Sequence, residues 1–150
     1  MRCRFAGSNW GYHIPEDQVA FAHGLIDRAV VHVVHGHSSH HVKGLEVYRD
    51  RLILYGCGDF LNDYEGIAGE ERYRPDLSLM YFPGLDASTG ALTRLEMAPM
   101  RIRNFRLNRV GRDDATWLQD VLNRESAARG VRVRLRPDGM LTAEWERSVP

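Results

Sequence analysis

The stretch of sequence that decides the fold is Val30-Val31-His32-Val33-Val34-His35-Gly36-His37-Ser38-Ser39-His40-His41. Its beginning, residues 30–34, is short and rich in β-branched valine, which predicts a buried β-strand. The strand is expected to stop at His35-Gly36, so the following residues would lie beyond its carboxyl end. In open α/β sheets ligands bind at that edge. The histidine cluster is therefore expected at a binding edge.

Histidine is unevenly distributed along the chain. All seven histidines lie within the first 41 residues, and five of them fall between residues 32 and 41. Imidazole is the commonest metal ligand in proteins, and Gly36 is expected to let the backbone turn sharply after the strand. His37 and His40 are therefore the candidate ligands of one metal ion or of two adjacent ions. For His32, inside the predicted strand, a packed side chain is the simpler interpretation.

The remaining elements follow from periodicity and turn residues. Pro15, followed by two acidic residues, predicts a helix that runs to about Ala29. A second helix is expected to be capped by Asp113 or Asp114 and to end at Gly130. The predicted strands cover residues 44–48, 52–55, 77–82, 91–97, 102–107, 131–135 and 140–145, and a long loop covers residues 56–75.

These elements define a fold class. A β-α-β start followed by antiparallel strands predicts an α+β fold with mixed and antiparallel strands and two main helices. No complete strand is expected before Gly7. The expected organisation is therefore a single, truncated domain over residues 1–150.

Composition limits the function. Twenty basic residues balance twenty acidic ones, so no overall field favours nucleic acid or a membrane surface as a partner. Two cysteines, Cys3 and Cys57, cannot form a disulfide framework. Two reduced thiols are the expected state, and a single bridge between them is the alternative. The sequence shows neither a signal peptide nor an apolar run long enough to span a bilayer. The chain is expected to be cytoplasmic, and a membrane-associated parent stays an open alternative.

Three sequence blocks carry a family resemblance. Residues 36–40 read Gly-His-Ser-Ser-His, residues 43–48 read Lys-Gly-Leu-Glu-Val-Tyr, and residues 52–64 read Leu-Ile-Leu-Tyr-Gly-Cys-Gly-Asp-Phe-Leu-Asn-Asp-Tyr. In this order they resemble the GHxxH signature and the following block of CapA-type capsule or poly-γ-glutamate synthesis proteins. The resemblance implies the C-terminal half of an α/β/β/α sandwich like that of calcineurin-type metallophosphoesterases. It also implies a role in the synthesis or export of an anionic capsule polymer.

The resemblance further implies a metal site. His37 and His40 would be ligands for divalent Mn, Fe or Zn in a di-metal centre that binds phosphate and activates water. Five other residues are candidates for orienting those ligands through hydrogen bonds or for contacting substrate: Asn9, Trp10, His35, His41 and Asp59. For Asp59, capping of a turn is the competing interpretation.

The chain departs from the family pattern in two ways. An HWG motif upstream supplies the family with another histidine, and either Phe5 or Asn9 stands in that place. The half of the family fold that brings Asp and Asn ligands is also missing. We therefore assign no catalytic residue and expect weak metal binding. Phosphoesterase-like hydrolysis is expected only with a partner, either a missing N-terminal half or polymer-synthesis machinery.

Arginine alternates with apolar residues in two stretches that overlap predicted strands, residues 101–106 and 132–136. Such alternation is typical of a half-buried strand with one solvated face, and contact with an anionic polymer is the sharper alternative. The second functional hypothesis is accordingly a non-catalytic accessory module that binds a protein partner or an anionic polymer. A third is a small protein that binds one metal ion through His37 and His40.

Overall fold

The computed structural model describes residues 2–61 and 69–147, with side chains from residue 7 onward. In chain order the strands and helices are β1 (Arg2–Ala6), α1 (Glu16–Ala29), β2 (Val33–His37), β3 (Leu45–Tyr48), β4 (Arg51–Leu54), β5 (Leu77–Leu85), β6 (Leu92–Arg103), β7 (Arg106–Arg109), α2 (Arg112–Ser126), β8 (Val131–Leu135) and β9 (Leu141–Trp145). Short 3-10 turns at Glu71–Tyr73 and Ala127–Arg129 complete the described elements.

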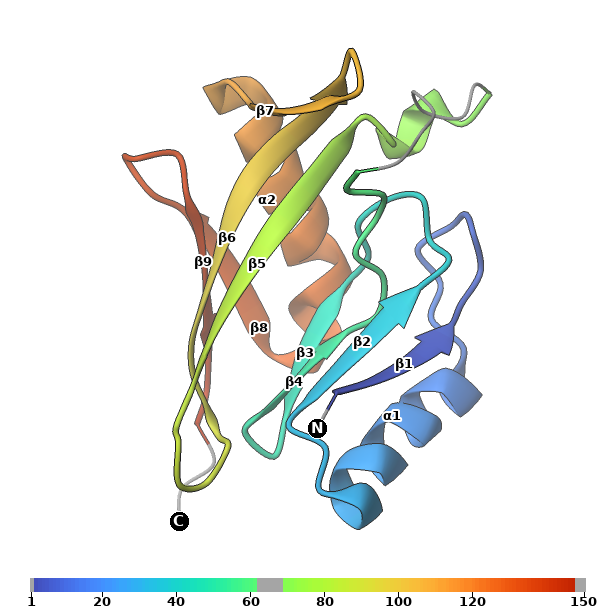
Figure 1. Ribbon diagram of the computed structural model, residues 1–150, viewed down its shortest axis with the longest axis vertical. Coiled ribbons are helices and arrows are strands. Elements are labelled where there is room, and N and C mark those ends of the chain that lie inside the picture. Colours follow the sequence, from blue (N-terminus) through green and yellow to red (C-terminus); the bar gives the residue numbers. More distant parts are fainter. Residues whose placement is uncertain (1, 62–68, 148–150) are drawn as a thin grey trace.

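The first sheet is mixed. Its strand order is β1-β2-β4-β3, in which β1, β2 and β4 are parallel and β3 is antiparallel to β4. α1 lies along this sheet (Figure 1), and Ala22, Val34 and Ile53 are fully buried in the core that the helix and the sheet share. Each buried Val or Ile side chain stabilises the fold by about 1.5–3 kcal/mol. This packing holds β2 firmly in the sheet.

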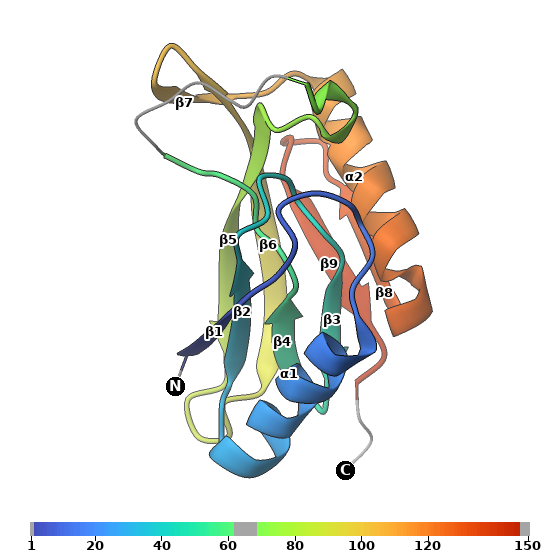
Figure 2. The same cartoon turned by 90° about the vertical axis from the view of Figure 1, so that its right-hand side faces the viewer.

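The second sheet is antiparallel. Its strand order is β5-β6-β9-β8, and β7 pairs with β6. α2 packs against β8 and β3 and stands beside the mixed sheet (Figure 2). Leu54 of the mixed sheet, Leu79 of the antiparallel sheet and Leu118 of α2 belong to one buried cluster. The fold is therefore α+β, with two helices and with mixed and antiparallel sheets, as predicted.

The first two strands differ from the prediction. β1 was not expected, because Arg2–Ala6 has no β-branched pattern; its parallel pairing with β2 along the whole strand is a tertiary interaction. β2 begins three residues later than predicted. Val30 ends α1 with a left-handed φ of 53° and is 70% exposed. The valine run is thus divided between the helix end and the strand.

The predicted strand over residues 102–107 is also wrong. β6 ends at Arg103 and β7 begins at Arg106, and the two residues between them, Asn104 and Phe105, have φ values of 53° and 54°. Two central residues with positive φ are the mark of a tight hairpin turn, which sequences usually build with Asn-Gly. Phenylalanine in this conformation costs roughly 1–2 kcal/mol. Because phenylalanine stands where a hairpin turn usually has glycine, the sequence gives no signal for this turn.

The cap predicted for α2 is wrong as well. Gly111 occupies the N-cap without a side-chain hydrogen bond. Asp114 instead accepts a hydrogen bond from Arg74 and pairs with Arg101. Part of the long loop predicted over residues 56–75, namely residues 62–68, lies outside the described residues.

Candidate functional site at the edge of the two sheets

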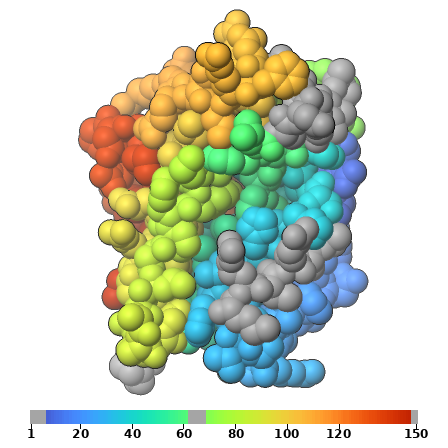
Figure 3. All heavy atoms as spheres, viewed as in Figure 1, coloured from blue at the N-terminus to red at the C-terminus, as the bar shows by residue number. Residues whose placement is uncertain are grey.

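A cleft of about 730 Å³ lies between β2 of the mixed sheet and β5 of the antiparallel sheet. On the face drawn in Figure 3, the side chains of β5 lie beside those of β2. Histidines and one carboxylate line one side: His32, His35, His37, His40 and Asp59. The other side is apolar and includes Leu79, Tyr81, Pro83 and Leu85. The arrangement suits a ligand with one polar and one apolar part.

Strand geometry places two histidines in this cleft. Side chains two residues apart on a strand share a face, so His35 and His37 both lie on the cleft side of β2, whereas Val34 faces α1. His37 is the last residue of the strand, and its Nδ1 atom lies 3.4 Å from the hydroxyl of Ser38. The strand therefore continues through the first half of the histidine cluster.

Gly36 is needed for a different reason from the one predicted. It lies inside β2, and the sharp turn expected there does not occur; the backbone turns at Ser38, where φ is 79°. A Cβ atom on Gly36 would lie 2.3 Å from the carbonyl oxygen of Tyr55. A side chain would therefore clash with the chain that follows β4.

His40 is held by a carboxylate. Its Nδ1 atom lies 3.0 Å from one oxygen of Asp59, and both side chains are about four-fifths buried, at 19% and 18% exposure. Because an ionised carboxylate only accepts hydrogen bonds, Nδ1 is the donor. In the neutral ring the lone pair is then on Nε2. A histidine oriented in this way is prepared to bind a metal ion or to accept a proton.

Asn9 and Trp10 support His40 from the loop after β1. The carbonyl oxygen of Asn9 accepts a hydrogen bond from the backbone N–H of His40, so Asn9 contributes its backbone to this contact. The Trp10 ring lies 5.2 Å from the His40 ring, between centroids. Neither residue lines the cleft; they position a residue that does.

His41 lies in a separate environment. It is fully buried and packs 4.6 Å from Tyr73 and 4.9 Å from Tyr12, between ring centroids. Its Nδ1 atom donates to the carbonyl oxygen of Val42 over 2.9 Å. Burial lowers the pKa of His41 to about 4, because a charged ring would lose its hydration. The ring is neutral at physiological pH and helps to hold the fold.

The cleft offers fewer metal ligands than a complete site needs. Within residues 2–61 and 69–147, no three His, Cys, Asp or Glu side chains come together as a metal-binding group. Cys57 lines the cleft, but burial raises the pKa of its thiol to about 12, so it is protonated and a poor ligand. The described residues therefore contain no group of side chains that could hold a di-metal centre.

Sequence reasoning missed the apolar side of the cleft. Leu79, Tyr81 and Pro83 alternate along β5 with residues of the opposite face. That period of two is the signal that could have found them. What the sequence does not show is that β5 lies beside β2, because the two strands belong to different sheets.

Part of the chain matches a known protein family. Residues 4–64 match the family described as bacterial capsule synthesis protein PGA_cap. The match covers the last three residues of β1 and all of α1, β2, β3 and β4, together with His37, His40 and Asp59. The matched segment therefore contains the polar side of the cleft.

Two curated relatives agree with that match. They are proteins of two Mycobacterium tuberculosis strains, CDC 1551 / Oshkosh and H37Rv, and each is named "Probable polyglutamine synthesis accessory protein". Each is 49% identical over 135 residues, which is 90% of this chain and 35% of the relative. The chain thus spans about a third of the length of the curated relatives it matches. These matches confirm the resemblance to CapA-type capsule synthesis proteins.

Two other expectations stand as follows. Among the helices of the described residues, none combines the length and the apolar composition that crossing a membrane requires. The expectation that residues 1–150 are a truncated single domain stays a prediction.

Proposed function

We propose that this chain acts in the synthesis of a bacterial capsule polymer of the poly-γ-glutamate type. In this proposal His37 and His40 contribute two ligands to a divalent Mn, Fe or Zn ion, in a site related to those of metal-dependent phosphoesterases. The observation that carries the metal assignment is the hydrogen bond from His40 Nδ1 to Asp59 at the cleft. The polymer assignment is supported by the matches to capsule and polyglutamine synthesis proteins.

The His40–Asp59 pair supports metal binding for a chemical reason. Histidines that bind metals commonly donate their second ring N–H to a carboxylate, which fixes the ring and makes the ligating nitrogen more basic. Removing such a partner typically lowers metal affinity about 10- to 100-fold. His37, which ends the neighbouring strand, lines the same cleft. A bound ion would polarise a phosphoryl or carbonyl oxygen of a ligand whose apolar part lies against the apolar side of the cleft.

Two imidazoles alone give weak binding. Tight protein sites for such ions use three or four protein ligands, and the described residues provide fewer. Further ligands would have to come from a partner chain or from other parts of a longer protein. The relatives' name, accessory protein, supports a role beside other components of polymer-synthesis machinery.

Metal titration of the purified chain tests this proposal. Isothermal titration with Mn²⁺ and Zn²⁺ should show weak binding that falls at least about tenfold in His37→Ala and in His40→Ala. Asp59→Asn keeps the shape of the side chain but removes its charge, and should cost about tenfold. His13→Ala removes an exposed imidazole and serves as the matched control. Metal uptake that is the same in all of these variants would remove the site assignment.

A second candidate function has an observation of its own. A non-catalytic accessory module would bind the polymer without reacting with it. Two arginines at the tip of one hairpin favour such contact, and they are argued separately below.

A further inference from the structure

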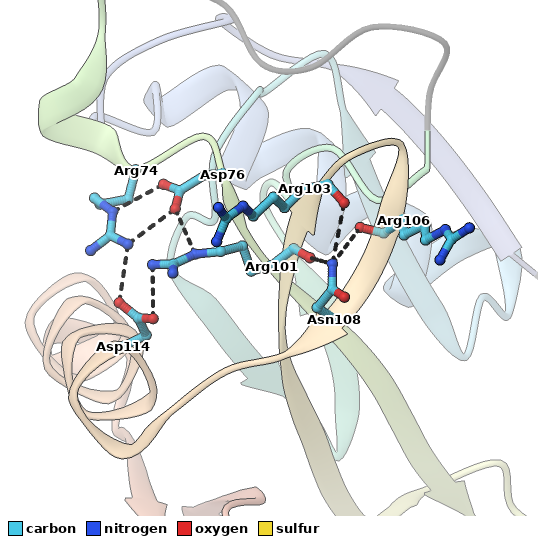
Figure 4. A network of polar contacts seen from close by, with 7 residues as sticks. All are labelled: Arg74, Asp76, Arg101, Arg103, Arg106, Asn108 and Asp114. Carbon is cyan, nitrogen blue, oxygen red and sulfur yellow. Dashed lines mark hydrogen bonds and ion pairs between the residues drawn. The ribbon is translucent and has the colours of Figure 1, made fainter.

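The tip of the β6–β7 hairpin carries two arginines at directly paired positions. Arg103 of β6 and Arg106 of β7 are directly paired across the strands, on either side of the two-residue turn Asn104–Phe105. Their side chains start from the same face of the sheet, but in Figure 4 their guanidinium groups point away from each other. The two positive charges therefore lie on opposite sides of the turn that they flank.

A neighbouring arginine on the same strand is neutralised. Arg101 lies 3.0 Å from Asp76 and 2.8 Å from Asp114, and Arg74 bridges the same two carboxylates (Figure 4). That network holds two positive and two negative charges. Across the described parts of the chain, by contrast, no carboxylate pairs with Arg103 or Arg106. Among the described residues, the two arginines at the hairpin tip therefore have no carboxylate partner.

The backbone of the turn itself is strained. Phe105 has a φ of 54°, a conformation that glycine or asparagine adopts far more readily. Its side chain is 59% exposed, so burial does little to offset the strain. Strain and unmatched charge at one exposed turn are typical of a surface retained for binding.

We propose that this tip binds a polymer that carries repeated carboxylates. Arg103 and Arg106 would each bind one carboxylate through the two-pronged guanidinium geometry, and Phe105 would cover the aliphatic part of the polymer. The choice of a glutamate-type polymer rests on the proposed role in capsule synthesis. The binding site itself follows from the charges and geometry of the hairpin.

The geometry favours a polymer over a small anion. In Figure 4 the two guanidinium groups point in opposite directions from the strands. One small anion would therefore meet one arginine at a time, whereas a chain with repeated acidic groups meets both. Unmatched charges also favour carboxylates over the neutral amides of a glutamine polymer, because a charged acceptor forms the stronger hydrogen bond.

The hairpin lies close to the functional end of the molecule. Its turn is at the end toward which β1 and β2 run, in both views of the ribbon (Figures 1 and 2). The histidines that line the cleft follow the carboxyl end of β2. A polymer held by the hairpin would therefore lie at the same end of the protein as the cleft.

Binding of fluorescently labelled oligoglutamate to the full chain tests the proposal. Fluorescence anisotropy should show binding that weakens with added salt and falls about tenfold or more in the double variant R103Q/R106Q. The single variant R106Q should lose about threefold. The double variant R28Q/R132Q removes the same charge from exposed positions on α1 and β8 and should change affinity less than twofold. Oligoglutamine of the same length should bind at least tenfold more weakly than oligoglutamate.

Several outcomes would overturn the proposal. Equal losses in R103Q/R106Q and R28Q/R132Q would show that only net charge matters. Equal affinity for oligoglutamine and oligoglutamate would show that the tip does not select carboxylates. Binding to anionic phospholipid vesicles that requires Arg103 and Arg106, without binding to oligoglutamate, would assign the tip to a membrane instead. Metal uptake by the His37 and His40 variants is measured separately, so failure of either proposal leaves the other testable.

Discussion

His40 and His41 are neighbours in the chain but lie in two different regions of the molecule. His40 lines the cleft and donates a hydrogen bond to Asp59. His41 is fully buried among aromatic rings, and burial lowers its pKa to about 4. Trp10 packs against both rings and is therefore part of both regions. One histidine is positioned to meet a ligand, whereas the other stabilises the structure that positions it.

The largest expected difference between the two histidines is in stability. His41→Ala removes a fully buried ring and its hydrogen bond to Val42, and should lower the free energy of unfolding by about 2–4 kcal/mol. His40→Ala removes a ring that is about four-fifths buried, together with its hydrogen bond to Asp59, and should cost less, about 1–2 kcal/mol. Urea denaturation followed by circular dichroism measures both values. Equal losses would contradict the division into a ligand region and a structural region.

The two regions should also differ in their response to acid. In the unfolded chain His41 takes up a proton near its ordinary pKa of 6.5, whereas in the folded chain it resists protonation until about pH 4. Between these values the unfolded state binds more protons, so stability increases with pH. The contribution of His41 to the free energy of unfolding is complete above pH 6.5. It is lost as the pH falls to about 4, and the loss amounts to roughly 2–3 kcal/mol.

The variant His41→Phe isolates this effect. It keeps an aromatic ring in the cluster and removes the titrating group. Its unfolding free energy should therefore depend less on pH than that of the parent chain in the same window. A parallel pH dependence in both proteins would show that other groups cause the loss.

The smallest expected effect concerns Trp10, which packs against both histidines. Trp10 is nearly parallel to His41, with an interplanar angle of 8°, and is tilted by 39° against His40. A double-mutant cycle of Trp10→Leu with His41→Ala should give a coupling energy of about 0.5–1.5 kcal/mol. The same cycle with His40→Ala should give less, since His40 is partly exposed. A larger coupling to His40 would mean that Trp10 mainly supports the cleft.

Local signals predicted several elements correctly. α1 follows from Pro15 and the acidic residues after it, and the β8–β9 hairpin follows from alternation around a turn. β1 and the bounds of β2 could not be predicted, because both depend on pairing between distant segments. The turn at Asn104–Phe105 was missed since a strained phenylalanine replaces the usual glycine.

The candidate site was predictable in part. Chemistry and spacing single out His37 and His40, and Asp59 is one of five further candidates; the structure places these three residues in the lining of one cleft. The different environments of His40 and His41 are not visible in the sequence, because burial of His41 depends on Tyr12 and Tyr73, which come from segments far apart in the chain. The apolar side of the cleft comes from β5 in the other sheet, which no local pattern reveals.

The sequence by itself determined the α+β class, the concentration of histidine after one buried strand and the resemblance to capsule synthesis proteins. Those properties depend on residue type and on short-range order along the chain. The tertiary structure alone decided which histidine faces the cleft, where β2 begins and which arginines lack a carboxylate partner among the described residues. Each of these depends on burial and on charges from segments far apart in the chain, and only the packed fold brings them together.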